Sequence, residues 1–401
     1  MGYSMALSIN KQSITALHVG KYFPPHHGGM ETYMMDLLFS SKQHGMECAA
    51  IVHTTGRAAA STVEEYKRDH DQVLVVRAAT WFKFLYVPIS PSFAWNLSRL
   101  IARQRPDVIH LHLPNPSALW SVFIPSARRI TWIIHWQSDI VTAESGWMLK
   151  ILYWLIRPLE YSALKKARYV ITSSPTFLPY SLPLRRFREK CVIIPLGIRD
   201  NFEKSECHSS IRDRPLRVVA VGRLAHYKGY DVLLRAIHRT KNIELDIVGD
   251  GEQASSLKKI VSDLAISKRV RLHGAATDAE KERFLRESDC LCLPSTDRTE
   301  SFGVVLLEAM SASKACVVSD VEGSGMSWIV DHEVTGLVFK NRSVSALAAT
   351  LERLEQDRQL AIDLGQKGRA KYEQNFTIDH TTAAVLSLYG RRPAISESQK
   401  G

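Results

Sequence analysis

The stretch of sequence that decides the fold is Glu300-Ser301-Phe302-Gly303-Val304-Val305-Leu306-Leu307-Glu308. A turn-like run, 294–299, precedes it, and the residues that follow are typical of a helix. If residues 303–312 are helical, Glu308 lies in the helix and Glu300 lies on the loop that leads into it. Both acids then reach one crevice at a helix N-terminus, where free backbone N–H groups favour an anion. The pair predicts a site for a phosphate-bearing sugar, although either acid alone would be an ordinary helix-start or surface residue.

Short apolar runs that end in Gly, Pro or His recur on both sides of this stretch and alternate with amphipathic segments. The runs are 14–19, 48–53, 73–77, 108–113, 130–135, 169–172 and 192–195 in the first half, and 218–221, 245–248, 270–272, 290–293 and 315–319 in the second. The amphipathic segments include 31–44, 230–240, 255–264 and 279–287. Continuous apolar runs of this length suit parallel strands that are buried on both faces. Their alternation with helices predicts an α/β protein made of right-handed βαβ units in doubly wound sheets.

A polar run over 203–214, followed by Pro215, separates the two sets of predicted strands. We therefore predict two Rossmann-like domains that face a central cleft, over residues 1–200 and 201–375. Residues 343–365 are predicted to be helical. Residues 376–401 are predicted to form a C-terminal helix, which packs back towards the first domain, and a disordered tail.

The composition excludes several classes of protein. The 401 residues are 45% hydrophobic and 23% charged, which is ordinary for a globular protein. The six cysteines form no Cys-x-x-Cys pair, so neither a zinc ribbon nor a redox motif is indicated, and we expect reduced thiols. Because neither a signal peptide nor a run of 18 apolar residues is found, we expect a cytoplasmic protein without a transmembrane helix.

The net charge of +11 is unevenly distributed. Residues 1–200 carry 23 Lys and Arg against 13 Asp and Glu, whereas residues 201–401 carry 29 against 28. The basic first half would attract nucleic acid, anionic lipid or a phosphorylated acceptor. Its aromatic residues do not interleave with Lys and Arg as a base-stacking platform would, which argues against nucleic acid.

Glycines follow two of the predicted strands, at the corners where ligands bind in doubly wound sheets. Gly28 and Gly29 would let the backbone approach a ligand closely just before a helix, but a tight turn that needs glycine explains them equally well. Gly249 begins Gly249-Asp250-Gly251-Glu252, which we interpret as a strand-to-helix turn that faces the nucleotide. Without a third glycine this motif carries little information.

A third corner, Gly222-Arg223-Leu224-Ala225-His226-Tyr227-Lys228-Gly229, holds two cations. Arg223 can bind a diphosphate as a planar fork, and Lys228 can bind it as a point charge. The chain has no Walker A pattern, so this loop does not belong to a P-loop ATPase. The alternative is that both are ordinary surface cations.

Three histidines lie near predicted strand ends. His110 and His112 flank one strand end, and His135 ends the strand 130–134. A three-histidine metal site is conceivable, but no acidic ligand stands at a suitable spacing, and we predict no metal. A more economical interpretation is that one of these imidazoles contacts the reacting sugar or a phosphate.

The segment 147–156 is densely apolar and is interrupted by Lys150. It is too short to span a bilayer. Trp147, Tyr153 and Trp154, with basic neighbours, are typical of a segment that lies at a membrane interface, and residues 81–86 would add to it. The alternative is a buried core helix with a loop packed on it.

Four features together resemble the retaining glycosyltransferases of the GT-B fold, family 4, over nearly the whole chain. They are the Gly28-Gly29 loop, the 222–229 loop, the Glu300…Glu308 pair and Thr335-Gly336-Leu337-Val338. The segment 323–328 also resembles bacterial mannosyl- and related transferases that build lipopolysaccharide O-chains or exopolysaccharide. The resemblance implies a hexosyltransferase that uses a nucleotide-diphosphate sugar, GDP-mannose first and UDP-hexoses next, and a lipid-linked or oligosaccharide acceptor.

The resemblance also implies roles for particular residues. Arg223 and Lys228 would hold the donor diphosphate, Glu308 the nucleotide ribose, and Glu300 the hydroxyls of the donor sugar. His135 corresponds to a position near the anomeric centre. The predicted catalytic residues are His135, Glu300, Arg223 and Lys228. The predicted donor-binding residues are Arg223, Lys228 and Glu300 together with Gly28, Gly29, Gly222, Gly249, Phe302, Gly303, Val304 and Glu308. The residues predicted to contact the acceptor or the membrane are His112, Trp147, Lys150, Tyr153 and Trp154.

The implied chemistry is consistent with these residue types. Cations and helix N–H groups stabilise the negative charge of the leaving diphosphate, so we expect neither a metal nor another cofactor. Closure of the domains would exclude water, which competes as an acceptor. We expect an enzyme at the inner face of the cytoplasmic membrane, bound peripherally to anionic lipid. The alternatives are a sugar-nucleotide epimerase or hydrolase of the same fold, a nucleic-acid-binding protein and an inactive scaffold.

Overall fold

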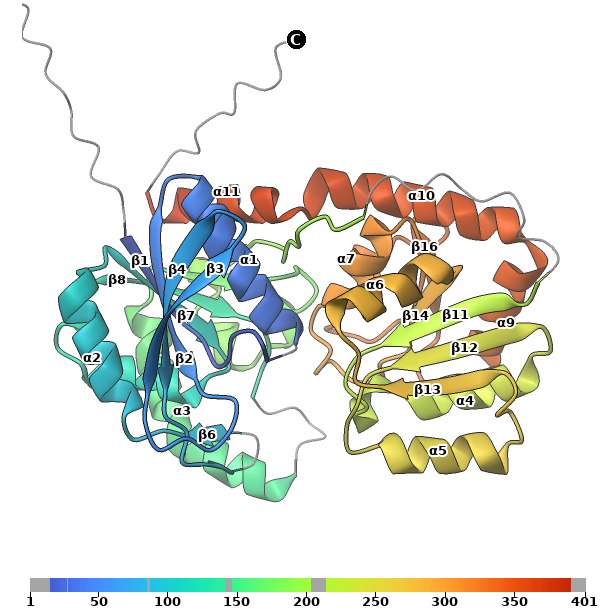
Figure 1. Cartoon of the computed structure of the whole chain (residues 1–401), viewed down its shortest axis with the longest axis horizontal. Helices are drawn as coiled ribbons and strands as arrows, with labels where there is room; N and C mark the ends of the chain where they lie inside the picture. The colour runs from blue at the N-terminus through green and yellow to red at the C-terminus, as the bar shows by residue number, and fades with distance from the viewer. Residues whose placement is uncertain (1–14, 27, 85–86, 141–145, 203–213, 391–401) are drawn as a thin grey trace, which may run out of the picture.

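The computed structural model describes residues 15–26, 28–84, 87–140, 146–202 and 214–390. These residues form two α/β domains that lie side by side, each built around a largely parallel sheet (Figure 1). The predicted disordered tail and most of the predicted linker lie outside the described residues.

The sheet of the first domain has the strand order β10-β9-β8-β7-β1-β2-β4-β3. The strands are β1 (Thr15–Val19), β2 (Glu47–His53), β3 (Thr62–Arg68), β4 (Asp71–Ala78), β7 (Val108–Leu113), β8 (Thr131–Trp136), β9 (Tyr169–Thr172) and β10 (Cys191–Ile193). All pairs are parallel except β3–β4. β5 (Phe82–Phe84) and β6 (Val87–Ile89) pair separately as an antiparallel hairpin. The sequence interpretation missed β3 because this edge strand is polar and mostly exposed, so no apolar run marks it.

Helices cover both faces of this sheet. The helices are α1 (Gly29–Gln43), α2 (Phe93–Gln104) and α3 (Trp147–Lys166), with the 3-10 helices η1 (Pro116–Phe123), η2 (Ala127–Arg129), η3 (Leu178–Tyr180), η4 (Pro183–Arg186) and η5 (Arg188–Lys190). In β1, Ala16 packs with Leu37 of α1, whereas Leu17 and Val19 belong to a separate apolar cluster with Leu97 of α2. Both faces of the strand are therefore buried, which explains the continuous apolar run in the sequence.

The sheet of the second domain is entirely parallel, in the order β13-β12-β11-β14-β15-β16. Its strands are β11 (Leu216–Val221), β12 (Ile243–Val248), β13 (Val270–Gly274), β14 (Cys290–Leu293), β15 (Ala315–Ser319) and β16 (Gly336–Phe339). Its helices are α4 (Tyr230–Arg239), α5 (Ala254–Asp263), α6 (Asp278–Glu287), α7 (Val304–Ser311), α8 (Met326–Ile329) and α9 (Val344–Gln356), with η6 (His226–Lys228). The strand order reverses between β11 and β14, and in the first sheet between β1 and β7. Crevices open at such switch points, and most of the predicted site residues follow these four strands.

The last two helices connect the domains. The helix predicted over 343–365 is divided at Asp357, whose carboxylate accepts a hydrogen bond from Leu360 N and starts α10 (Arg358–Asn375). α10 lies along the second domain, and α11 (Ile378–Leu388) crosses to the first domain and packs on α1 (Figure 1). At the crossing Ile198 pairs with Thr377: Ile198 N donates to Phe376 O at 3.1 Å, and Ile378 N donates to Ile198 O at 2.9 Å. The two connections between the domains therefore run side by side.

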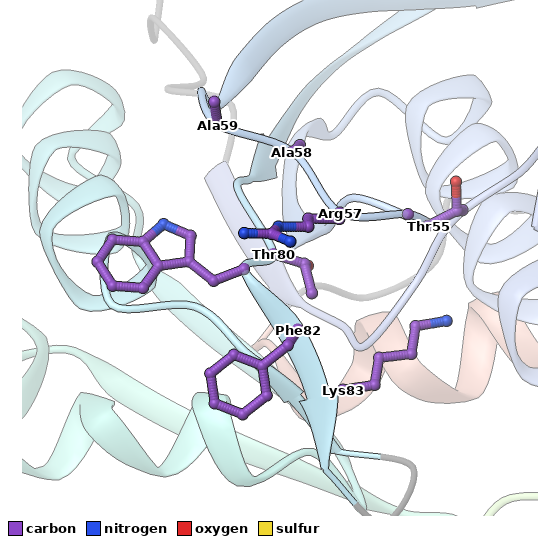
Figure 2. Close-up of a pocket in the computed structure, with 9 residues that line it drawn as sticks. Thr55, Arg57, Ala58, Ala59, Thr80, Phe82 and Lys83 are labelled. Atoms are coloured by element: carbon purple, nitrogen blue, oxygen red, sulfur yellow. The ribbon is translucent and has the colours of Figure 1, made fainter.

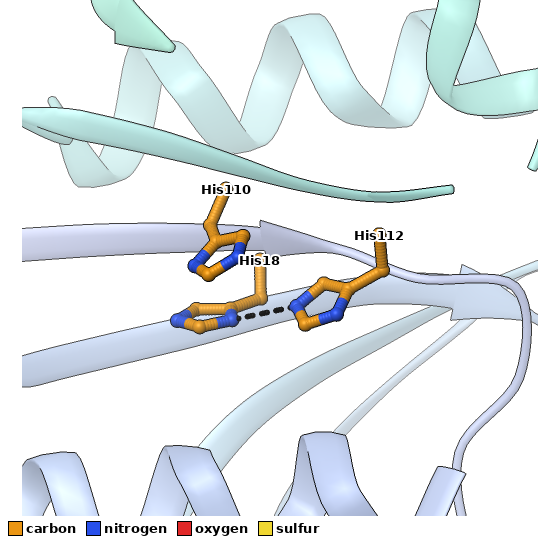
Figure 3. A group of neighbouring side chains, drawn as sticks. All are labelled: His18, His110 and His112. Carbon is orange, nitrogen blue, oxygen red and sulfur yellow. Dashed lines mark hydrogen bonds between the residues drawn. The ribbon is translucent and has the colours of Figure 1, made fainter. Parts of the chain in front are cut away.

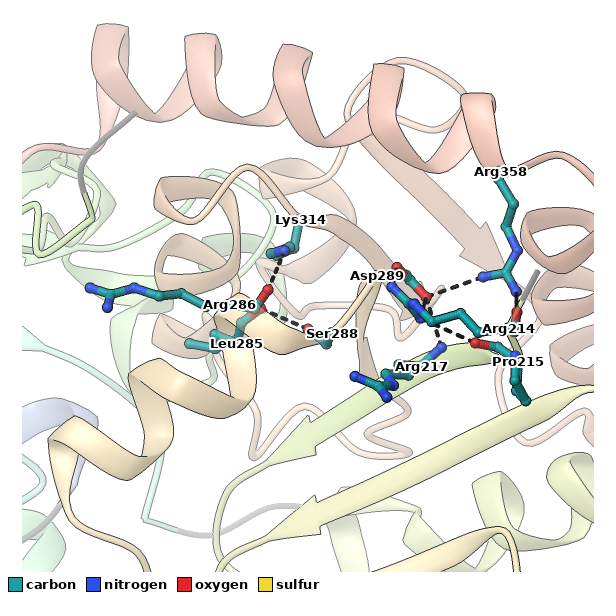
Figure 4. A network of polar contacts seen from close by, with 9 residues as sticks. All are labelled: Arg214, Pro215, Arg217, Leu285, Arg286, Ser288, Asp289, Lys314 and Arg358. Atoms are coloured by element: carbon teal, nitrogen blue, oxygen red, sulfur yellow. Dashed lines mark hydrogen bonds and ion pairs between the residues drawn. The ribbon is translucent and has the colours of Figure 1, made fainter. Parts of the chain in front are cut away.

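A buried carboxylate fastens three elements of the second domain together (Figure 4). Asp289, which precedes β14, accepts two hydrogen bonds from the guanidinium of Arg214, at 2.7 and 2.8 Å. It also accepts one from Arg358 at the start of α10, at 3.1 Å, and one from the backbone N–H of Arg217 in β11, at 2.8 Å. Four hydrogen bonds, three to Oδ2 and one to Oδ1, offset the desolvation of this carboxylate.

We predict that Asp289→Asn lowers the free energy of unfolding by about 3 kcal/mol, because two guanidinium groups lose their buried counter-charge. Urea denaturation of the parent and the variant measures this change. Asp263→Asn, at an exposed carboxylate of the same domain, is the control and should change stability by less than about 0.5 kcal/mol. Equal losses in the two variants would contradict a special role for Asp289.

Candidate active site

The N-termini of α1 and α7 meet between the two domains. A Cβ atom placed on Gly29 would lie 3.2 Å from the Cβ atom of Val304, so the first turns of the two helices are in contact. The N-cap residues are Gly28 and Gly303, and glycine has no side chain with which to cap a helix. Gly303 has φ 89°, a conformation that L side chains rarely adopt. The arrangement brings two helix N-termini without a side-chain N-cap to one place, where backbone N–H groups favour an anion; the Glu31 carboxylate shares the α1 end.

Lys228 and Glu300 form an ion pair beside these helix ends. Their side chains are only 10% and 12% exposed, and Ser295 Oγ also donates to Glu300 Oε2 at 3.3 Å. Burial lowers the pKa of Lys228, but the Glu300 carboxylate and the hydroxyls of Tyr227 and Tyr230 outweigh burial, and the net pKa is raised. Lys228 is therefore a fixed positive charge at neutral pH. The two residues predicted to bind the diphosphate and the sugar are thus direct neighbours.

Arg223 lies further out and is half-exposed. Its Nη2 atom is 3.0 Å from Glu252 Oε2, so part of its charge is matched by a carboxylate that the sequence interpretation did not single out. Its charge still acts on the rest of the site. Burial raises the pKa of Tyr227, and Lys228 and Arg223 oppose that rise; burial lowers the pKa of Lys21 in the first domain, and Arg223 adds to that decrease. Arg223 therefore faces the gap between the domains.

The second predicted acid, Glu308, lies in α7 and is mostly buried. Lys281 Nζ, from α6, donates to Glu308 Oε1 at 2.8 Å. Burial lowers the pKa of Lys281, but Glu308 and Asp278 raise it above its ordinary value. The Glu308 carboxylate is thus held in a fixed position, but its neighbour is Lys281 rather than Arg223 or Lys228. Sequence reasoning missed Lys281 because its helix shows only an ordinary amphipathic pattern.

The predicted glycine corners of the second domain lie against each other. A Cβ atom on Gly222 would lie 3.1 Å from Lys228 Nζ, so this glycine borders the buried ion pair. A Cβ atom on Gly249 would lie 2.0 Å from the carbonyl oxygen of Gly222. Gly249 thus shapes the neighbouring corner through its backbone. Phe302 is buried against Phe376, so its side chain packs under the loop that carries Glu300 into α7.

The first domain contributes a narrow pocket that sequence reasoning largely missed. It is lined by residues that include Lys21, Tyr22, Glu31, His112 and Gln137. The Glu31 carboxylate lies over the start of α1, because a Cβ atom on Gly28 would lie 2.3 Å from Glu31 Oε2. Burial raises the pKa of Glu31, and its own backbone N–H and Lys21 lower it by less.

Gln137 occupies the place that the sequence analysis gave to His135. The strand β8 continues through Trp136, two residues beyond the predicted end at 134, so His135 lies inside the sheet and its side chain is fully buried. Gln137 is the first residue after the strand and lines the pocket. Its Nε2 atom is buried and has no hydrogen-bond partner among the described residues. An unpaired buried amide of this kind is available to a ligand. A correctly placed strand end would have identified it.

His135 belongs instead to a stack of four buried imidazoles on the α1 face of the sheet. His18 Nδ1 lies 3.0 Å from His112 Nε2 (Figure 3), and His110 stacks on His18, His112 and His135 with ring centroids 4.6 to 5.7 Å apart. The hydroxyl of Tyr389, the residue that caps the C-terminus of α11, lies 2.5 Å from His110 Nδ1. The His112 ring also borders the narrow pocket, so the stack connects the pocket with the C-terminal helix.

His18, His110 and His112 bring one nitrogen each within 4.8 Å of the others. Their ring planes lie within 28° of parallel. Because imidazole lone pairs lie in the ring plane, stacked rings direct them alongside one another rather than at one point, unlike a tetrahedral metal site. The geometry therefore favours a hydrogen-bonded stack, and the expectation that catalysis needs no metal stays a prediction.

We predict that this stack makes the protein sensitive to acid. Burial lowers the pKa of His18 and His135 to about 3. Below pH 6.5 the unfolded chain binds protons that the folded imidazoles do not, so the free energy of unfolding falls by about 1.4 kcal/mol per pH unit for each such histidine. Above pH 6.5 both states are neutral and the effect disappears.

Comparison of the parent with His18→Asn isolates the contribution of one imidazole from that of the carboxylates. Chemical denaturation between pH 7.5 and 4.5 should give a shallower loss of stability for His18→Asn below pH 6.5. Parallel curves for the two proteins would contradict the assignment.

Several contacts hold the two domains together beside the site. Arg298 Nη2 lies 3.0 Å from Asp139 Oδ2 in the first domain, and Ser301 Oγ donates to Gln137 O. Thr176 Oγ1 donates to Ser324 O at 2.8 Å. The segment 323–328, which suggested mannosyltransferases in the sequence, therefore lies at the contact between the domains.

The apolar segment predicted over 147–156 begins α3, and much of it is exposed. Trp147 and Trp154 are 73% and 70% exposed, and the buried residues of α3 are Glu160, Ala163 and Leu164 in its second half. Tyr153 turns inward and donates to Glu160 Oε1 at 2.6 Å. The interpretation of this segment as a buried core helix is therefore wrong. No helix of the described residues combines the length and the apolar character needed to cross a bilayer.

Comparison with known families and structures identifies the class of enzyme. The model "Glycosyl transferase 4-like domain" matches residues 28–197, and "Glycosyl transferases group 1" matches residues 201–371. The chain belongs to the GT-B glycosyltransferases. It is an enzyme, and the two sheets described above are the paired Rossmann-like domains of that fold.

Curated glycosyltransferases of similar length align with almost the whole chain. O-antigen chain mannosyltransferase C of Escherichia coli is 26% identical over 383 residues, which cover 93% of this chain and 97% of that protein. The GDP-mannose-dependent alpha-(1-6)-phosphatidylinositol monomannoside mannosyltransferase of Mycobacterium tuberculosis is 25% identical, covering 92% and 96%. D-rhamnosyltransferase WbpZ of Pseudomonas aeruginosa is 29% identical, covering 68% and 70%.

Solved structures of glycosyltransferases share the fold. Sucrose-phosphate synthase of Thermosynechococcus elongatus superposes with a TM-score of 0.74 at 21% identity, covering 94% of this chain and 98% of that one. HepE of Anabaena, in complex with UDP and glucose, superposes with a TM-score of 0.72 at 18% identity, covering 94% and 99%. The relatives named above are thus two mannosyltransferases and a rhamnosyltransferase.

Proposed function

We propose that this glycosyltransferase moves a hexose, mannose first, from a nucleotide-diphosphate sugar to a lipid-linked or oligosaccharide acceptor, with retention of anomeric configuration, in bacterial surface polysaccharide biosynthesis. Two full-length mannosyltransferase relatives, one of them GDP-mannose-dependent by name, support GDP-mannose as the donor. UDP-hexoses come next, because HepE of the same fold binds UDP. We place the enzyme in the cytoplasm.

The meeting of two uncapped helix N-termini beside the Lys228–Glu300 pair is the observation that carries this proposal. A diphosphate needs several N–H donors and at least one cation, and a sugar needs fixed acceptors for its hydroxyls. The backbone N–H groups at Val304 and Gly29 are the hydrogen-bond donors, Lys228 supplies the positive charge, and the Glu300 carboxylate accepts hydrogen bonds from the sugar hydroxyls. The carboxylate of Glu308 reaches the ribose in this assignment, held in place by Lys281.

The reaction breaks the bond between the anomeric carbon and the diphosphate oxygen and forms a bond from that carbon to an acceptor hydroxyl oxygen. Lys228 and the helix amides stabilise the charge that develops on the diphosphate, and Arg223 adds to them once it exchanges Glu252 for phosphate. The proton of the acceptor hydroxyl passes to the departing diphosphate, so no protein base is used. Because the chain supplies this positive charge itself, we propose that neither a metal nor another cofactor takes part.

A product assay tests the proposal. The purified enzyme is incubated with GDP-mannose, UDP-glucose or ADP-glucose, after a thermal-shift screen has ranked these donors. A new glycosidic bond, formed equally with and without EDTA, supports a metal-independent transferase. Rearranged or hydrolysed donor in the presence of saccharide acceptors would instead indicate an epimerase or hydrolase.

We predict that Arg223→Gln combined with Lys228→Gln lowers kcat at least 100-fold, because the leaving diphosphate loses both cations. Steady-state kinetics with saturating donor measure the change. Arg235→Gln, which removes an exposed cation of α4 in the same domain, should leave kcat within twofold. Near-normal turnover in the double variant would remove the diphosphate assignment.

We also propose that α3 rests on the surface of an anionic membrane. Trp147, Ile151 and Trp154 project from its first half, and Lys150 lies among them. Trp120 and Phe123 of η1, which packs against α3, are also exposed. A group of exposed, large apolar side chains with basic neighbours fits the interface of a bilayer, and the positive charge of the first domain favours anionic lipid. A lipid-linked acceptor would be presented at this surface.

We predict that Trp147→Ser combined with Trp154→Ser lowers binding to phosphatidylglycerol vesicles at least tenfold, since each large apolar side chain contributes about 2 kcal/mol when it leaves water. Sedimentation with vesicles measures the bound fraction. Val334→Ser, at an exposed apolar position of the second domain, is the control. Equal partitioning of the double variant and the parent would refute a membrane role for α3.

A further inference from the structure

A second, larger pocket opens in the first domain, apart from the residues assigned to the donor (Figure 2). Its volume is about 860 Å³, within the range of small-molecule sites. One wall is the loop after β2, with Thr55, Arg57 and Ala58; the other is the segment around β5, with Trp81 and Lys83.

Hydrogen bonds tie the two walls together at their base. Thr80 N donates to Thr54 Oγ1 at 3.0 Å, and Thr80 Oγ1 donates to Thr54 O at 3.2 Å. Ala58 N donates to Thr80 O at 2.8 Å, and Trp81 N donates to Ile89 O of β6 at 2.9 Å. The pocket is therefore part of the folded scaffold, and its side chains are presented from fixed backbone positions.

The charged residues that line this pocket are all basic. Arg57 and Lys83 are both cations, whereas no acidic residue belongs to the described lining. Trp81 and Phe82 are more than half exposed, at 53% and 56%. A guanidinium and an ammonium bind phosphate oxygens, and exposed aromatic faces pack against the apolar C–H face of a pyranose ring. This combination selects a sugar that carries phosphate over a neutral sugar or a free lipid chain.

The pocket adjoins both the reaction site and the apolar surface. Lys83 Nζ lies 5.1 Å from the centroid of the Tyr22 ring, and Tyr22 lines the narrow pocket that holds Glu31 and Gln137. The β5–β6 hairpin contacts η1 through β6, and η1 packs against α3. The pocket is thus linked through Tyr22 to the narrow pocket of Glu31 and Gln137, and through β6 and η1 to the exposed helix α3.

We propose that this pocket binds the acceptor through its phosphorylated sugar, that is, a saccharide joined to lipid through a phosphate or diphosphate. The sugar ring lies on Trp81 and Phe82 and the anion is held by Arg57, while Lys83, whose ammonium points the other way towards Tyr22, adds positive charge at the edge of the pocket (Figure 2). The inference rests on the proposed function, because it assigns the acceptor of that reaction. Phospholipid head groups offer the same anion without the sugar, and the test separates these two sources.

The probe is N-acetylglucosamine diphosphate carrying a ten-carbon citronellyl chain, which is water-soluble and needs no bilayer. Calorimetry should give binding to the parent, with affinity lowered at least tenfold by Arg57→Ala combined with Lys83→Ala, and lowered severalfold by Trp81→Ala. Arg128→Ala combined with Arg129→Ala removes the same charge from exposed positions of η2 in the same domain and should leave the affinity unchanged. Citronellyl diphosphate without the sugar should bind more weakly than the probe, and Trp81→Ala should leave its affinity unchanged.

Two further measurements separate this inference from the proposed function. Arg57→Ala combined with Lys83→Ala should retain the thermal shift produced by the donor and raise the KM for acceptor with kcat within threefold, whereas Lys228→Gln should retain probe binding. If the Arg57 and Lys83 variant binds the probe as the parent does, the pocket is not the acceptor site even where transfer is observed. If the parent binds phosphatidylglycerol vesicles more tightly than the probe, and binds the probe no more tightly than citronellyl diphosphate, the anion site binds phospholipid and the inference fails.

Discussion

The ion pair between Lys228 and Glu300 is the constraint on which the rest of the site depends. Two charges that are almost removed from water are tolerated only when each satisfies the other and their remaining hydrogen-bonding groups find partners. Gly222 leaves room for the ammonium, Ser295 donates to the carboxylate, and Tyr227 and Tyr230 lie close by. In the proposed assignment, a donor diphosphate would enter a place where a cation is already fixed and partly dehydrated, so little reorganisation would be needed when negative charge develops on it.

The same logic explains why both domains are needed. The second domain carries the ion pair and the start of α7, while the first carries the start of α1, the narrow pocket and the exposed aromatic surface. None of these alone surrounds a nucleotide sugar and its acceptor. The start of α1, which follows β1, contacts the start of α7, which follows β14, so residues beyond the two switch points border one place.

Sequence reasoning located much of this arrangement because strand ends and glycine corners are local signals. The turn-like run before Glu300 and the helix expected after it place Glu300, Gly303 and Glu308 at the start of α7, and the apolar runs match strands buried on both faces. The errors have physical causes. An error of two residues in the end of β8 separated His135 from the pocket and hid Gln137. Lys281 and Glu252 were missed because their pairing with Glu308 and Arg223 joins positions more than 25 residues apart, which no local pattern reveals.

The side-by-side connections at Ile198 and Thr377 limit how the two halves of the molecule move. The chain leaves the first domain and later returns to it at the same point, and the two passages are hydrogen-bonded to each other. The two domains therefore cannot move about the two passages independently. Any opening must bend both passages together about a single pivot. The paired passages at Ile198 and Thr377 are therefore the expected hinge of any domain closure.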